Sequence, residues 1–114
     1  MRIKCYCDLY VSDSLKKKQN SVLKNLMERK LSYPVYILTL SGGEQNHLEF
    51  FSSLLIQQHF YDEKELFIVG LAGDYMSAAD LTAEIAVDVQ KCTGGMDIRS
   101  YILNRQKEFE ESRG

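Results

Sequence analysis

Polar residues that could bind a ligand or take part in acid–base chemistry gather in three short turns of this chain. The turns are Ser12-Asp13-Ser14, Ser41-Gly42-Gly43-Glu44 and Ala72-Gly73-Asp74-Tyr75. Each follows a run that predicts a strand and precedes a run with helical spacing. Ligands of parallel α/β sheets bind where strands end and helices begin, so we predict a ligand-binding edge there. The residues of this predicted edge are Asp13, Ser41, Gly42, Gly43, His47, Gly73 and Asp74.

His47 is the residue of this edge with the widest chemical range, because imidazole titrates near neutral pH. It could form an acid–base pair with Asp13 or Asp74, although nothing in the spacing requires that pair. The sequence contains none of the motifs HExxH, CxxC, GxSxG or GxGxxG. Asp13, Glu44 and Asp74 would hold a magnesium ion only if they converged in space. We therefore identify no catalytic residue and predict neither a metal nor a cofactor.

Residues 40–45, with the sequence LSGGEQ, match the letters of the signature loop of ABC-type ATPases. Such a domain also needs a phosphate-cradling loop GxxxxGK[ST], and in this chain no glycine precedes a lysine. Ser41 and Glu44 fit a capping box, in which Ser41 is the N-cap of a helix and Glu44 reaches back to its amide. We interpret the segment as a turn. A phosphate or carboxylate bound at that helix N-terminus is the alternative.

The composition indicates one globular domain over residues 1–114, with 45% hydrophobic and 26% charged residues. No apolar run is long enough to span a membrane, and no secretory signal is present, so we expect a cytoplasmic protein without a membrane partner. The net charge is −2, although the first 31 residues carry eight basic and three acidic groups. A nucleic-acid partner is not predicted, because such proteins are usually basic overall.

Three cysteines, Cys5, Cys7 and Cys92, form an odd set in a chain without an export signal, which favours free thiols. Cys5 and Cys7 lie two residues apart in a predicted strand, so their side chains are expected on the same face. Two small buried hydrophobic residues are the preferred interpretation, and a redox pair is the alternative.

Hydrophobic periodicity predicts strands over residues 3–11, 35–40 and 66–72. It predicts helices over 15–31, 44–61 and 76–92, followed by a C-terminal helix that Asp97 caps and whose end, 107–114, is expected to fray. The β-α-β-α-β-α order with helical crossovers indicates a small three-layer α/β/α sandwich with three mainly parallel strands. Residues 66–72 contain no polar side chain, so they favour a central position in the sheet.

The leading hypothesis for function is a non-catalytic binding or interaction module. The alternative is an enzyme or a protein that binds a small anion, such as phosphate or a nucleotide, at the carboxyl-end edge of the sheet. A homodimer is also predicted, because the outer face of the first strand mixes tyrosine with charged residues in the way interfaces do. The residues of that predicted surface are Arg2, Lys4, Tyr6, Asp8 and Tyr10.

Overall fold

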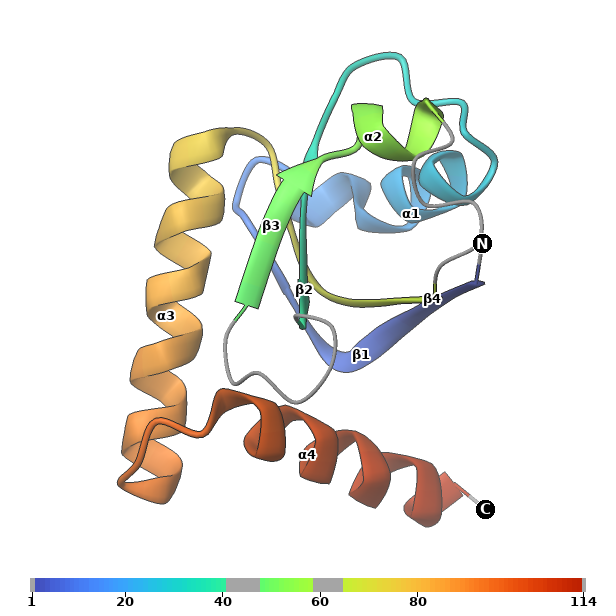
Figure 1. Ribbon diagram of the computed structural model, residues 1–114. Coiled ribbons are helices and arrows are strands. Elements are labelled where there is room, and N and C mark those ends of the chain that lie inside the picture. Colours follow the sequence, from blue (N-terminus) through green and yellow to red (C-terminus); the bar gives the residue numbers. More distant parts are fainter. Residues whose placement is uncertain (1, 41–47, 59–64, 114) are drawn as a thin grey trace.

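Within residues 2–40, 48–58 and 65–113, which the computed structural model describes, four strands form one sheet with helices packed on both faces (Figure 1). The strands are β1 (Arg2–Val11), β2 (Tyr36–Leu40), β3 (Leu48–Ser52) and β4 (Glu65–Ala72). The helices are α1 (Gln19–Met27), which follows the 3₁₀ turn η1 (Lys16–Lys18), then α2 (Leu54–Gln57), α3 (Tyr75–Thr93) and α4 (Ile98–Arg113). The predicted α/β class is confirmed.

The sheet has the order β1-β4-β2-β3 and is mixed. β1 and β4 are parallel, whereas β2 runs antiparallel to both β4 and β3. The apolar strand β4 occupies the interior position that its composition predicts. The prediction of mainly parallel strands is wrong, because β2 reverses direction and an additional strand, β3, extends the sheet.

The error lies in residues 44–61, for which a single helix was predicted. Leu48, Phe51, Leu54 and Leu55 follow helical spacing, but the described part of this segment forms β3 and the short helix α2. β3 pairs with β2 along its whole length, from Tyr36 opposite Ser52 to Leu40 opposite Leu48. Aromatic residues favour strands when they pack against neighbours on the pleated surface, and here that tertiary packing overrides the helical spacing.

Two hydrophobic clusters fill the layers on either side of the sheet, in agreement with the predicted α/β/α arrangement (Figure 1). The cluster under α1 and α2 contains Val11, Leu15, Val22, Leu26, Val35, Ile37, Ile56, Leu66, Ile68 and Leu71. The cluster under α3 and α4 contains Tyr6, Leu38, Val69, Ala72, Ala78, Leu81, Ile85, Val89, Ile98 and Ile102. β4 contributes to both clusters because it is buried on both faces.

β1 is irregular in its middle. It pairs with β4 up to Cys5 opposite Ile68 and resumes only at Tyr10 opposite Gly70, so residues 6–9 form a bulge. As a result Cys5 packs against the α1/α2 cluster and Cys7 against the α3/α4 cluster. The prediction that both thiols share one face is therefore wrong. All three cysteines are free thiols.

α4 lies across this bulge and covers the face of β1 that was predicted to form a dimer interface. The side chain of Tyr6 is only 3% exposed. Cys7 donates its backbone N–H to Gln106 Oε1 at 2.8 Å, and Asp8 forms an ion pair with Arg105. α4 therefore occupies the predicted self-association surface on β1, where Tyr6 belongs to the core and Tyr10 is partly buried against it.

Capping residues mark the ends of the two long helices, and Asp97 is the N-cap that the sequence predicts. Asp74 accepts a hydrogen bond from Ser77 N at 2.8 Å at the start of α3, and Gly94 ends that helix in the left-handed conformation with φ 75°. Asp97 accepts from Ser100 N at 3.1 Å at the start of α4, which extends to Arg113. None of the helices in the described part of the chain is long and apolar enough to cross a membrane.

Candidate ligand pocket at the carboxyl ends of β1 and β4

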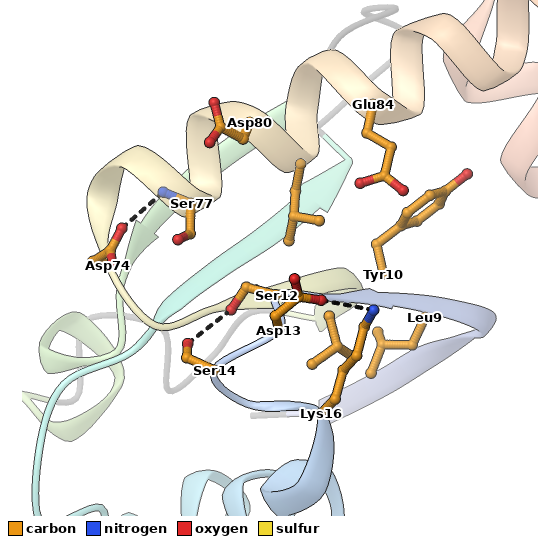
Figure 2. Close-up of a pocket in the computed structure, with 12 residues that line it drawn as sticks. Leu9, Tyr10, Ser12, Asp13, Ser14, Lys16, Asp74, Ser77, Asp80 and Glu84 are labelled. Atoms are coloured by element: carbon orange, nitrogen blue, oxygen red, sulfur yellow. Dashed lines mark hydrogen bonds and ion pairs between the residues drawn. The ribbon is translucent and has the colours of Figure 1, made fainter.

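A pocket of about 440 Å³ opens where β1 and β4 end and α3 begins (Figure 2). One wall is the end of β1 and the turn after it, and the other is the first three turns of α3. The lining residues are Leu9, Tyr10, Val11, Ser12, Asp13, Ser14, Lys16, Asp74, Ser77, Asp80, Leu81 and Glu84. Because β1 and β4 are parallel, their carboxyl ends meet at this edge, as expected for an α/β ligand site.

Hydrogen bonds between the two strand-end turns fix the floor of the pocket. Ser12 N donates to Leu71 O at 2.9 Å, and Gly73 N donates to Ser12 Oγ at 3.1 Å. The hydroxyls of Ser12 and Ser14 lie 3.3 Å apart and share a further hydrogen bond. A Cβ atom at position 73 would lie 2.5 Å from Ser14 Oγ, so glycine permits this close approach. The predicted turns thus form one connected unit.

Asp74 occupies the N-terminus of α3 at the rim of the pocket. The hydrogen bond from Ser77 N stabilises the ionised carboxylate and lowers the pKa of Asp74 below its ordinary value of 3.8. A negative charge therefore already sits in the field of the helix dipole. An incoming phosphate or carboxylate would have to compete with this carboxylate for the same amides.

Asp13 and Lys16 form an ion pair at the mouth of the pocket, with 2.9 Å between Nζ and Oδ1 (Figure 2). The hydrogen bond between them lowers the pKa of Asp13 and raises the pKa of Lys16. Glu84 adds a smaller attraction that also raises the pKa of Lys16. Among the described residues of the lining Lys16 is the only cation, and Asp13 offsets its charge.

The wall formed by α3 carries carboxylates that the sequence analysis did not identify. Glu84 points into the space beside Tyr10, whereas the Asp80 side chain points away from the centre of the pocket (Figure 2). Tyr10 donates its hydroxyl to Asp88 Oδ2 at 2.7 Å, and burial together with this bond raises the pKa of Tyr10. The sequence could have indicated that Asp80 and Glu84 lie on the same side of α3, because residues four apart are neighbours on a helix surface.

Three of the seven predicted edge residues meet at this pocket. Asp13 and Asp74 line it, and Gly73 forms the turn beside it. The prediction that all three turns open at one edge is wrong. β2 runs antiparallel to β4, so its last residue, Leu40, lies near the amino end of β4 and away from the pocket. The remaining four predicted residues fall outside the described residues: Ser41, Gly42, Gly43 and His47.

The lining can supply negative charge and hydroxyl groups but no imidazole or thiol. Four of its side chains are carboxylates and one is a lysine. Within residues 2–40, 48–58 and 65–113, no three or more His, Cys, Asp or Glu side chains converge closely enough to hold a metal ion. The chemistry that these groups support is charge-assisted hydrogen bonding to a cation.

No family model matches the chain, and neither a curated protein nor a solved structure shows significant similarity to it.

Proposed function

We propose that this protein is a non-catalytic binding module whose pocket at the ends of β1 and β4 takes a cationic group. The group is an ammonium or a guanidinium, carried by a small amine or by a basic side chain of a partner protein. The observation that carries this proposal is the charge of the described lining, which contains four carboxylates and one lysine and in which Glu84 points into the pocket. The electric field of these carboxylates attracts a cation and repels an anion.

The arrangement of the carboxylates supports one principal contact. Asp13 is paired with Lys16, and Asp74 is engaged with the amide of Ser77. Glu84 points into the pocket, and the interaction described for it is a weaker attraction to Lys16. Its carboxylate is therefore the group best placed to receive a charged donor, with the oxygens of Asp74 and Asp13 as secondary acceptors.

The size and polarity of the pocket suit a small polar ligand. A volume of about 440 Å³ falls within the range of small-molecule sites. Such sites are usually mostly apolar, and this one is lined mainly by charged groups and hydroxyls. A flexible amine with donors at both ends would use these acceptors better than an apolar compound would.

A binding role is favoured over catalysis because the described hydrogen bonds of the Ser12 and Ser14 hydroxyls involve each other and a backbone amide, not a base. Ser12 Oγ accepts from Gly73 N and shares a hydrogen bond with Ser14, an arrangement that holds two turns together. An activated nucleophile needs an adjacent base within hydrogen-bond reach. The alternative, an enzyme or an anion-binding protein at the same edge, would rely on Lys16, whose charge Asp13 offsets.

Isothermal titration with agmatine, which carries a guanidinium and an ammonium, tests the proposal. We expect saturable binding that weakens as the salt concentration rises, because exposed charges are screened. Glu84→Gln should weaken binding by about two- to fivefold, the range of a partly exposed charge pair. The matched control Glu28→Gln, at the exposed end of α1, should leave the affinity unchanged. Binding of inorganic phosphate in place of agmatine would favour the alternative.

The predicted homodimer remains part of the proposal, although its interface cannot be the face of β1 that α4 covers. Two-fold dimers are the commonest soluble assemblies. Of the described large hydrophobic side chains, several stay exposed on this small domain, among them Tyr75 and Met76 at the start of α3.

A further inference from the structure

The two outermost strands of the sheet, β1 and β3, differ in how well they are protected against pairing with another strand. At the β1 edge, residues 6–9 bulge and α4 crosses the strand, so that Gln106 takes up the N–H of Cys7. Bulges and charged residues are common means of blocking an edge. The opposite edge is β3, which is regular along all five of its residues. No described strand pairs with its outer side, and in Figure 1 no helix lies in front of it.

The backbone groups of β3 that face outward can be deduced from its pairing with β2. Ser53 N donates to Val35 O at 2.8 Å, so this antiparallel position is of the hydrogen-bonded type. Hydrogen-bonded and non-hydrogen-bonded pairs alternate along the ladder. Phe51 and Glu49 therefore bond to β2, whereas the N–H and C=O groups of Leu48, Phe50 and Ser52 point away from the sheet.

We propose that two copies of the chain associate by antiparallel pairing of β3 with β3 about a two-fold axis at Phe50. This rests on the homodimer of the proposed function and identifies its interface. In this register Phe50 bonds to Phe50 of the second copy, and Leu48 bonds to Ser52 of the second copy. All the outward backbone groups of the strand are satisfied, and the two sheets become one.

The charge pattern of β3 selects this register and favours a second copy as the partner. Glu49 is the only charged residue of the strand, and in the register centred on Phe50 it lies opposite Phe51 of the second copy. A register centred on Glu49 would place two carboxylates directly opposite each other, which is destabilising. The register centred on Glu49 would also pair fewer of the outward backbone N–H and C=O groups of β3. The strand is therefore complementary to itself in one register.

An aromatic cluster beside the axis supplies apolar surface for the same contact. The rings of Tyr36, Phe50 and Tyr75 contact one another edge to face, with centroid distances of 5.3 to 6.3 Å. Tyr75 remains 59% exposed and Met76 67% exposed. Leu48 and Phe50 pack on this same face of the sheet. Two-fold pairing of β3 would bring the two clusters together, and aromatic residues and methionine are enriched in interfaces.

Light scattering of the wild-type chain and of charge variants tests the interface. The wild type should have twice the 13.1 kDa mass of the chain. Phe50→Lys and Phe50→Glu should each be monomeric, because position 50 faces itself across the axis. An equimolar mixture of the two variants should recover the dimer. Phe109→Lys on α4, an exposed aromatic position remote from β3, is the matched control and should remain dimeric.

Amide hydrogen exchange of the wild type gives a second measurement that does not depend on the folding of any variant. The amides of Leu48, Phe50 and Ser52 should become protected as the protein concentration rises, whereas those of Glu49 and Phe51 should be protected throughout. A wild-type mass of 13.1 kDa at every concentration would overturn both the homodimer and this interface. A dimer that persists in Phe50→Lys, with amides 48, 50 and 52 exchanging freely, would overturn the interface alone.

Discussion

Replacing Gln106 by methionine tests how α4 stabilises the bulge in β1. Gln106 is 6% exposed, and its Oε1 accepts the N–H of Cys7 at 2.8 Å. Methionine has a similar volume, so the change removes the acceptor without opening a large cavity. The N–H of Cys7 would then lack a partner under α4, and a buried unpaired donor costs about 1–3 kcal/mol.

The second hydrogen bond of Gln106, from Nε2 to Glu110 Oε1 at 3.2 Å, reaches an exposed carboxylate and should contribute little. The free energy of unfolding in urea should therefore fall by about 1–3 kcal/mol, and Tm should fall by roughly 4 °C or more. The control Gln90→Met, at an exposed position of α3, should change stability by less than about 0.5 kcal/mol. If the urea curves of the two variants superimpose, Gln106 does not support the bulge.

Two further predictions concern the strand-end turns and the close approach of β1 to β4. Gly70→Ala would place a Cβ atom 3.0 Å from the Tyr10 carbonyl oxygen and should cost about 1–3 kcal/mol in urea unfolding, whereas Gly95→Ala, with its nearest neighbour at 3.8 Å, should be close to neutral. Asp74→Ala should lower Tm at pH 7, and Asp74→Asn, which keeps a capping side chain, should lower it less. The hydrogen bond from Ser77 lowers the pKa of Asp74 in the folded state, so its stabilisation is present above pH 3.8 and is lost as the pH falls through the lowered pKa. The Tm difference between wild type and Asp74→Ala should therefore shrink in acid, and a difference that stays constant down to pH 2 would contradict this role.

The parts of the fold that local sequence determines could be predicted. β4 is apolar from Leu66 to Ala72, and α3 has a buried stripe from Ala78 to Val89 with Asp74 and Gly94 at its ends. These signals depend on neighbouring residues only, so periodicity and capping rules detect them.

The features that depend on distant contacts could not be predicted. The spacing of Leu48, Phe51 and Leu54 is compatible with a helix, and only pairing with β2 makes residues 48–52 a strand. The bulge of β1 depends on Gln106, which is 99 residues away from Cys7 in the chain. No local pattern in β1 indicates that a side chain of α4 will accept the N–H of Cys7.

The candidate site shows the same division. Asp13 and Asp74 were predicted because each follows a strand, and the parallel pairing of β1 with β4 brings them to one pocket. Glu84 was missed because its contribution depends on which face of α3 borders the end of β1. Its position is set by the burial of Leu81 and Ile85 against the sheet, which leaves the flank of the helix with Glu84 beside Tyr10.

The central claim is that the pocket between β1 and α3 binds a cationic group, and residue-resolved NMR titration with agmatine tests it most directly. Saturable amide shifts should be confined to residues 9–16, 73–77 and 80–84, and the same titration of Glu84→Gln should require a higher agmatine concentration. Shifts located away from these segments, or shifts at these segments produced by inorganic phosphate and not by agmatine, would contradict the claim.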